Sequence, residues 1–291
     1  MKRIVILLIT LLPVISVQTC FGQDNGHNDG SIRLIIRGDD IGSFHAANVG
    51  CMKSYKDGIM QSVEIMVPCP WYPEAVSMLN KNPGLDVGVH LVMTSEWENM
   101  KWRPLTGASS ITDERGYFYP MVWPNDEFPP SRAFRASNWK LEDVEKELRA
   151  QIDLAKRDIH SLSHITTHMG FASADPAIDS LVDALAKEYG LDIKLEDYDV
   201  QRFRYERKRG DSAEERVDAF IEAVKQLVPG TYLYVEHPAM DTREMESIGH
   251  KGYKKVGRDR QMVTDVFTHP RLKKALMENN IRLISYADLL E

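Results

Sequence analysis

Cysteine is scarce in this chain. Its 291 residues include three cysteines, Cys20, Cys51 and Cys69, and no Cys-x-x-Cys pair. This count excludes a disulfide-stabilised scaffold and a cysteine-rich structural zinc site. We expect Cys51 and Cys69 to be small buried hydrophobic residues, and the sequence leaves open whether they form a disulfide.

A long block of basic residues is also absent. The chain has 36 Lys and Arg against 43 Asp and Glu, mixed along its length, for a net charge of −7. This pattern argues against nucleic acid or an anionic membrane surface as the main partner. Hydrophobic residues make up 43% of the chain, which is enough for a sizeable core and excludes global disorder.

An apolar run lies at the N-terminus. Lys2 and Arg3 precede apolar residues 4–17, and small residues follow. A basic start, an apolar stretch of roughly 7–15 residues and a small-residue exit are typical of a secretory signal peptide. We therefore expect residues 1–22 to be removed and the mature protein to be exported, periplasmic or secreted, without a stable membrane span. A lipoprotein is disfavoured, because Cys20 lacks the small-residue context that lipidation requires.

Nucleotide-binding and nucleophile-elbow motifs are missing. Gly38-Asp39-Asp40-Ile41-Gly42, which follows the first expected strand, is not the G-x-G-x-x-G of a dinucleotide site. Neither a P-loop nor a G-x-S-x-G sequence occurs. The first strand is followed by a pair of carboxylates, and this favours a barrel over a doubly wound sheet.

Strand-like and helix-like segments alternate along residues 31–291. Expected strands are 32–36, 59–67, 85–93, 163–168, 191–195, 231–236 and 281–285, and expected helices are 46–56, 73–80, 141–159, 176–189, 213–227 and 270–278. Residues 94–137 are rich in proline and show no sustained period, so we expect an insertion or long loop there. The pattern predicts a single α/β domain, a distorted TIM-like barrel of about seven β/α units.

Acidic residues and histidines fall at the ends of several expected strands. Asp39 and Asp40 follow the first strand, His90 lies on the third, His168 ends the fourth and His237 follows the sixth. In a β/α barrel these ends meet at one mouth, where imidazole and carboxylate groups can hold a divalent ion for hydrolysis. Each residue also has a structural interpretation: Asp40 could cap a helix, and a lone histidine could be hydrogen-bonded at the rim.

His164 and His168 are four residues apart, so they point to the same side of a strand. His168 lies nearer the carboxyl end, where barrel sites are found. At roughly 3.3 Å per residue, His164 lies about 13 Å back along a straight strand, too far to share a metal ion with His168. We predict that His168 is a ligand and that His164 is a buried, hydrogen-bonded support.

The motifs, in this order, resemble those of the YdjC-like carbohydrate deacetylases, the family that includes chitooligosaccharide deacetylase and the hopanoid-biosynthesis deacetylase. The matching segments are Arg37–Gly42, Ser62 with Met66, Val87–Leu91, Ser163–His168, His237–Ala239 and Ile281–Tyr286. Together they span about residues 32–288, nearly the whole of the expected mature chain. The sequence departs from the family motifs at three places: Arg37 replaces an Asn, Thr166 replaces an Asp, and Met169-Gly170 stands where many members have a further His.

The resemblance implies a metal-dependent hydrolase that removes N-acetyl groups from amino sugars or oligosaccharides. By motif position it implies Asp40, His90 and His168 as ligands of one divalent metal ion, Asp39 as the general base and His237 as a general acid. Two imidazoles and one carboxylate suit zinc, whereas completion by water oxygens suits magnesium. The sequence does not indicate an oligomeric state.

Two alternatives stay open. One is a metal-dependent esterase or amidase that acts on another exported glycan, and the other is a carbohydrate-binding barrel without activity. The presence of both Asp39 and Asp40 disfavours the second, because binding alone needs no base beside a ligand. Aromatic residues of the insertion could stack on sugar rings or pack onto the barrel; they are Trp97, Trp102, Tyr117, Tyr119 and Trp123.

Overall fold

The structure is a computed structural model that describes residues 30–208 and 210–291. The predicted signal peptide, residues 1–22, lies outside the described residues. Within the described ranges no helix is both long enough and apolar enough to cross a membrane. Cys51 and Cys69 are buried free thiols, so the disulfide that the sequence left open is not formed.

The described residues form one α/β domain around a parallel sheet. Its strands are β1 (Ile32–Ile41), β2 (Ser62–Ile65), β3 (Asp86–Leu91), β4 (Leu162–Thr167), β5 (Gln201–Arg202), β6 (Gly230–Glu236) and β7 (Ile281–Ile284). The helices are α1 (His45–Lys56), α2 (Tyr72–Asn80), α3 (Leu141–Asp158), α4 (Pro176–Tyr189), α5 (Ala213–Val224), α6 (Val256–Phe267) and α7 (Pro270–Glu278). Most of the expected helices begin and end within a few residues of these bounds.

The strand β1 is the centre of the sheet. It pairs with β6 along one side, and on the other side β7 pairs with Ile32–Ile35 while β2 pairs with Arg37–Ile41. The strand order is β4-β3-β2-β1-β6-β5, with β7 also beside β1. In the described part of the chain no ladder joins the edge strands β4 and β5, and β5 has only two residues to offer. The sheet is therefore a curled half-barrel. Our prediction of an α/β domain is confirmed, whereas our prediction of a TIM-like barrel of seven units is wrong, because the barrel does not close.

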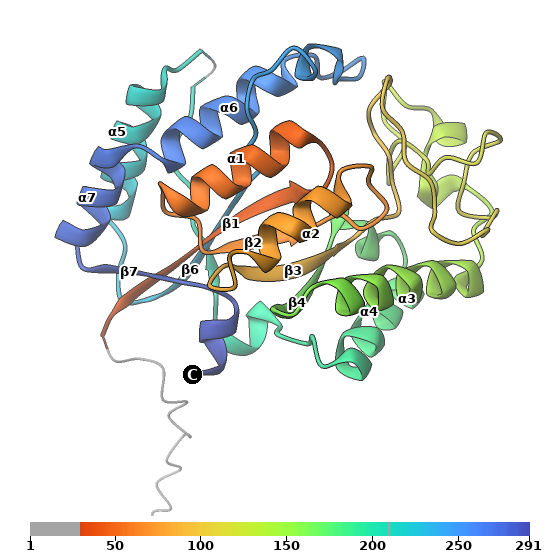
Figure 1. Ribbon diagram of the computed structural model, residues 1–291, viewed down its shortest axis with the longest axis horizontal. Coiled ribbons are helices and arrows are strands. Elements are labelled where there is room, and N and C mark those ends of the chain that lie inside the picture. The colour runs from red at the N-terminus through yellow and green to blue at the C-terminus, as the bar shows by residue number, and fades with distance from the viewer. Residues whose placement is uncertain (1–29, 209) are drawn as a thin grey trace, which may run out of the picture.

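Helices cover one face of the sheet, and the site lies at the other. Figure 1 shows α1 and α2 in front of β1–β3, with α3 and α4 beside β4 and α5–α7 at the other end of the sheet. Leu34 and Ile36 of β1 face the large core under these helices, whereas Ile35 joins a smaller inner cluster. Because side chains alternate along a strand, the inner series that starts at Ile35 continues with Arg37 and Asp39. The sheet thus carries two charged residues to its inner face.

Residues 191–195 do not form the strand that we predicted. Asp192 makes an isolated bridge to His164, and the chain then passes through a 3₁₀ turn at Leu195–Tyr198 before β5. The alternation of apolar and polar residues in this segment marks a half-buried extended stretch without a ladder of its own.

Sequence periodicity also missed α6. Its buried face includes Arg260 and Thr264 as well as Val263 and Phe267, so a charged residue interrupts the apolar period that identifies a helix. Arg260 is buried because its guanidinium pairs with Asp40. The pairing of Arg260 with Asp40, 220 positions away, therefore explains why a charged residue lies on the buried face of α6.

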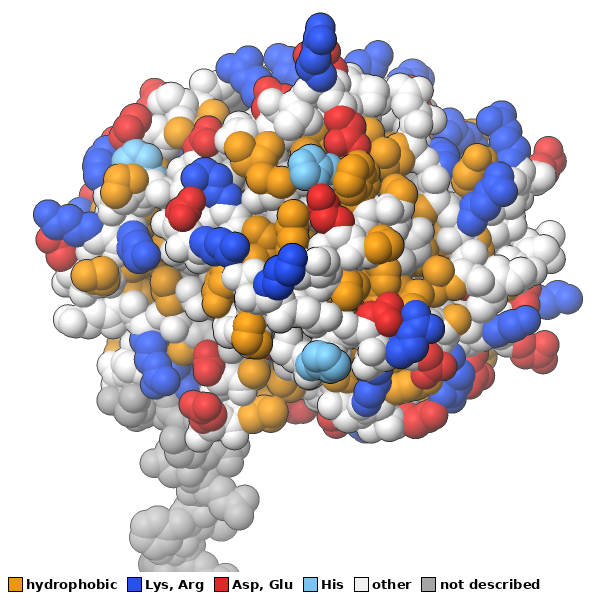
Figure 2. Space-filling view, viewed as in Figure 1, with side chains coloured by type: hydrophobic (Ala, Val, Ile, Leu, Met, Phe, Trp, Pro, Cys, Tyr) orange, Lys and Arg blue, Asp and Glu red, His pale blue; other side chains and the backbone are white. Residues whose placement is uncertain are grey.

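The insertion, residues 94–137, contains two short 3₁₀ turns, Pro130–Arg132 and Phe134–Ala136, and no α-helix or strand. Trp97 and Trp102 are 3% exposed, so these two aromatics pack onto the domain. Trp123 is 42% exposed. The face drawn in Figure 2 carries interspersed basic and acidic side chains, with hydrophobic side chains exposed in small groups, as on an ordinary solvated surface.

Glycine at position 88 lets two buried side chains meet across β3. Glu64, Gly88 and His164 occupy aligned positions of β2, β3 and β4. The Glu64 Oε1 atom and the His164 Nε2 atom are 2.6 Å apart, and both residues are fully buried. A Cβ atom at position 88 would lie 2.4 Å from Glu64 Oε2 and 2.5 Å from His164 Nε2. The absence of a side chain at Gly88 is therefore a condition for this buried pair.

We predict that Gly88→Ala lowers the free energy of unfolding by about 1–3 kcal/mol, because the methyl group forces Glu64 and His164 apart. Urea unfolding followed by circular dichroism measures the change. Gly107→Ala is the matched control, since a Cβ atom at position 107 meets nothing within 4 Å. Equal stability of the two variants would contradict the role given to Gly88.

Candidate metal centre

Three predicted ligands come from the ends of three strands. Asp40 lies near the end of β1, His90 near the end of β3, and His168 directly after β4, as the first residue of a 3₁₀ segment. Asp40 has φ 74°, in the left-handed region that non-glycine residues seldom adopt. Its carbonyl oxygen accepts hydrogen bonds from the Ser43 backbone and hydroxyl, which stabilise this turn. Asp40 does not cap the following helix, because the N-cap of α1 is Phe44.

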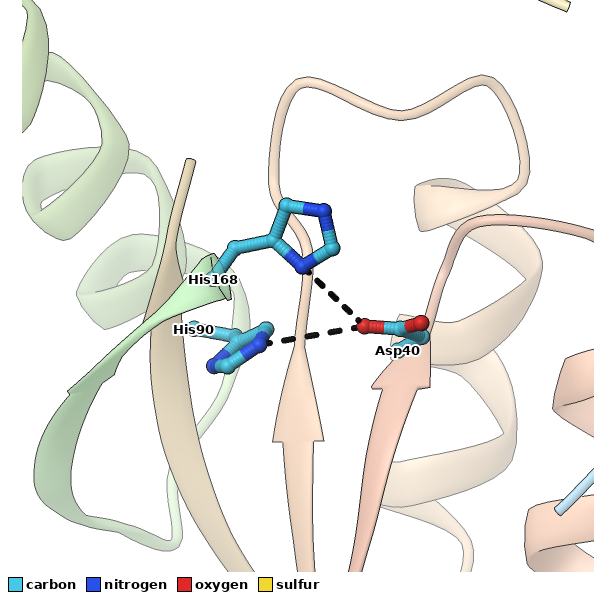
Figure 3. Close-up of side chains that lie close together, drawn as sticks. All are labelled: Asp40, His90 and His168. Carbon is cyan, nitrogen blue, oxygen red and sulfur yellow. Dashed lines mark ion pairs between the residues drawn. The ribbon is translucent and has the colours of Figure 1, made fainter. Parts of the chain in front are cut away.

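The donor atoms of these residues converge on one point (Figure 3). The Oδ1 atom of Asp40 is 3.4 Å from His168 Nδ1 and 3.7 Å from His90 Nε2. The three ligand atoms all lie within 4.8 Å of one another, and the three residues are 1–3% exposed. Metal–ligand bonds of about 2.1 Å at tetrahedral angles separate the ligand atoms by about 3.4 Å, so the spacing fits one ion.

The hydrogen bonding of Asp40 indicates whether Asp40, His90 and His168 suit a cation. Its Oδ2 atom accepts a 2.7 Å hydrogen bond from Arg260 Nη2. Its Oδ1 atom is buried and has no hydrogen-bond donor among the described residues. A buried acceptor without a partner is costly, and an ion facing two imidazole nitrogens would satisfy it. The donor set therefore fits a divalent metal.

Each histidine has its other ring nitrogen occupied. His90 Nδ1 lies 2.7 Å from the Thr166 hydroxyl, which in turn donates to Glu64 Oε2. His168 Nε2 lies 3.1 Å from Glu96 Oε2. Such outer partners hold one tautomer and one ring orientation, with the lone pair of the remaining nitrogen directed at the ion. Thr166, where the family motif has Asp, thus links His90 to the buried carboxylate of Glu64.

The charges around the site favour a cation between His168 and Asp40. Burial opposes ionisation of Asp40, yet Arg260, His237 and His168 outweigh it and hold the pKa of Asp40 well below its usual range. Burial lowers the pKa of His90 to about 4. For His168 burial acts in the same direction, but Glu96 and Asp40 outweigh it and raise the pKa to about 10. A carboxylate on each side of His168 therefore makes this part of the site attract positive charge.

Asp39 is held by the residue that departs from the family motif. Arg37 donates to both carboxylate oxygens of Asp39, at 2.8 Å from Nε and 3.0 Å from Nη2, and its Nη1 donates to the Tyr286 hydroxyl at 2.7 Å. Both Arg37 and Asp39 are less than 9% exposed. The Asp39 Oδ2 atom is 3.9 Å from His90 Nε2. Asp39 is therefore fixed beside the three donor atoms.

His237 approaches from the end of β6. Its Nε2 atom is 4.0 Å from Asp40 Oδ2, and its side chain is 42% exposed. Unlike the three predicted ligands, which are buried, it is substantially exposed to solvent within a cleft. This cleft has a volume of about 1450 Å³ and is also lined by Asp39, Asp40, His90 and His168.

His164 lies behind the centre and outside the set of three donors. It is fully buried, it bonds to Glu64, and its ring stacks on Tyr286 with centroids 3.7 Å apart. The prediction that His164 is buried and hydrogen-bonded is confirmed.

Sequence reasoning missed several residues of the site. Arg260 lies in the helix that periodicity did not reveal, and Glu96 lies in the irregular insertion. Glu64 could have been found, because it is a lone carboxylate within an apolar strand, and a buried charge of that kind requires a partner.

Comparisons with known proteins agree with the fold and the motifs. The family model described as YdjC-like protein matches residues 33–278. "Carbohydrate deacetylase 1" of Listeria innocua is 28% identical over 269 residues, which cover 89% of this chain and 100% of that protein. "Carbohydrate deacetylase" of Thermus thermophilus is 32% identical over 232 residues, which cover 72% of this chain and 79% of that protein.

A solved structure shares the fold. It is a protein of Enterococcus faecalis V583 that is named for cellobiose-phosphate cleavage, with a TM-score of 0.67 and 23% sequence identity. The match covers 89% of this chain and 99% of that one. With the family match over most of the sequence, these findings lead to one conclusion: the chain belongs to the YdjC-like protein family.

Proposed function

We propose that this chain is a metal-dependent hydrolase that removes N-acetyl groups from amino sugars or oligosaccharides. The observation that carries the proposal is the buried, unsatisfied Oδ1 atom of Asp40, which faces ring nitrogens of His90 and His168. The family match and the names of the Listeria and Thermus relatives support a carbohydrate deacetylase. Export after cleavage near residue 22 is part of the proposal and would place the substrate outside the cytoplasm.

Asp40, His90 and His168 would hold one divalent ion, either zinc or magnesium. Such an ion would act as a Lewis acid on the acetyl carbonyl and lower the pKa of the attacking water. Arg260 keeps Asp40 ionised and fixes one of its oxygens, so that the other stays directed at the two imidazoles. Glu96 and Thr166 fix the two rings in the same way.

Asp39 would accept the proton of the attacking water. Arg37 fixes the carboxylate from one side with two hydrogen bonds. Each carboxylate oxygen can accept more than one hydrogen bond, so Asp39 can still receive a proton while Arg37 holds it. General base catalysis of this kind contributes roughly 10²–10⁴-fold to the rate.

His237 would protonate the leaving nitrogen. Water adds to the acetyl carbon, Asp39 takes a proton from that water, and the C–N bond then breaks. The nitrogen departs as an amine only if it receives a proton, which the protonated His237 ring would donate. The products are acetic acid, which ionises to acetate, and the free amine. Asp39 ends protonated and His237 neutral, and transfer of a proton from Asp39 to His237 through solvent restores the starting state.

We predict that Asp40→Ala and His90→Ala abolish both bound metal and acetate release, because each removes a ligand. Asp39→Asn should keep the metal and lose roughly 10²–10⁴-fold in acetate release, since it removes only the base. Metal content is measured by mass spectrometry after purification without chelator, and acetate is assayed on N-acetylated oligosaccharides. Undiminished acetate release by Asp40→Ala would show that the function is assigned wrongly.

Addition of O-acetylated glycans to the same assay separates the two alternatives. A preference for O-acetylated over N-acetylated glycans would identify an esterase. Bound metal and bound glycan without any acetate release would identify a binding protein.

We predict that His168→Ala loses the metal, whereas His164→Ala keeps it at a cost of about 2–4 kcal/mol in the free energy of unfolding. The cost arises because the buried Oε1 atom of Glu64 loses its hydrogen-bond partner and Tyr286 loses its stacked ring. Metal content and urea unfolding are measured on both variants. His164→Gln replaces His164→Ala if the latter does not fold, and equal metal loss at positions 164 and 168 would contradict the assignment.

A further inference from the structure

The cleft is lined by more basic than acidic side chains. Ten Lys and Arg residues line it against seven Asp and Glu residues, although Asp and Glu outnumber Lys and Arg in the chain as a whole. The face in Figure 2, in contrast, has its two kinds of charge interspersed. The excess of positive charge is thus concentrated where a substrate would bind.

Acidic residues at the inner end of the cleft are already paired. Arg37 pairs with Asp39, and Arg260 pairs with Asp40. Glu236, which precedes His237, pairs with Arg207. Lys194 and Lys251 pair with Asp183 and Glu127, so five of the ten basic residues have an acidic partner and the other five carry the excess.

Two arginines on β5 and α5 have no acidic partner. Within the described ranges, no carboxylate pairs with Arg202 or Arg216, both of which line the cleft. The Nε atom of Arg216 is buried and has no hydrogen-bond acceptor in the described part of the chain. Together with Arg207 they form what we call the arginine wall, next to the strand that carries His237. An unsatisfied buried guanidinium donor is costly unless a ligand supplies an acceptor.

A second cationic group lies at the start of α6. Lys254, Lys255 and Arg258 line the cleft there and are exposed, with no acidic partner in the described residues. The N-terminus of a helix carries a partial positive charge, so cations at this position are unfavourable for the helix itself. Their placement is explained if they attract an anion into the cleft.

We propose that the cleft binds glycans that carry anionic groups, carboxylates or sulfates, on sugars next to the N-acetylated residue. This inference rests on the deacetylase function proposed above. The arginine wall would bind the anionic group of the sugar beside the one whose acetyl group is removed. Guanidinium groups form paired hydrogen bonds with carboxylate and sulfate oxygens, whereas the hydroxyl groups of a neutral oligosaccharide leave the positive charges uncompensated.

Binding of matched oligosaccharides tests this inference. The metal-loaded Asp39→Asn variant is used because its turnover should be slow, and its affinity is measured by titration calorimetry. The ligands are chitohexaose, which is neutral, a hyaluronan hexasaccharide, which carries carboxylates, and a keratan sulfate oligosaccharide, which carries sulfates. We expect at least one anionic ligand to bind about tenfold more tightly than chitohexaose at low salt, with a gap that narrows at about 0.5 M NaCl. The better anionic ligand identifies the preferred group.

Substitution of the arginine wall is the second part of the binding experiment. In the same background, Arg202→Gln with Arg216→Gln should remove most of the preference for anionic ligands. Arg282→Gln should leave it unchanged, because Arg282 is exposed on β7 and does not line the cleft. Equal affinity for neutral and anionic ligands, a preference that survives the double substitution, or no binding of any anionic ligand would overturn the inference.

Acetate release separates this inference from the proposed function. Release from chitohexaose without any anionic preference would leave the deacetylase function standing and refute the anionic subsite. An anionic preference without acetate release from any of the three ligands by the unsubstituted protein would refute the deacetylase function while the charge recognition holds.

Discussion

Two adjacent carboxylates are buried at the end of β1, and the rest of the site depends on how their charges are compensated. Two unit charges 4 Å apart repel by roughly 4 kcal/mol at an effective dielectric constant of 20, and burial adds a desolvation cost. Arg37 compensates Asp39 from within the same strand, whereas Arg260 reaches Asp40 from α6. The ion pair between Arg260 and Asp40 therefore both docks a helix on the sheet and fixes the carboxylate.

The two arginines hold the two carboxylates in different ways, and this difference separates the roles of Asp39 and Asp40. Arg260 occupies one oxygen of Asp40 and leaves the other facing His90 and His168, which is a ligand arrangement. Arg37 holds both oxygens of Asp39, which therefore stays beside the three donors as a separate group. Neighbouring residues of one strand can thus serve as ligand and base because each has its own arginine.

The sequence predicted those parts that depend on local pattern. The apolar run of β1, the amphipathic helices and the polar residues at strand ends identified the α/β class and several candidate site residues. The resemblance to the family then singled out Asp40, His90 and His168 as ligands. Closure of the barrel could not be predicted, because it depends on whether β4 and β5 pair with each other. We did not predict α6, because a charged residue such as Arg260 normally indicates an exposed position. Its burial depends on Asp40, which lies 220 positions away in the sequence.

Anomalous diffraction from crystals grown with zinc would show whether Asp40, His90 and His168 bind one metal ion. Data collected on both sides of the zinc absorption edge locate the ion independently of any assumption about its ligands. We expect one strong peak about 2.0–2.2 Å from Asp40 Oδ1, His90 Nε2 and His168 Nδ1. A peak bound by Glu96 or His164 in place of these atoms, or no peak near Asp40, would contradict this expectation.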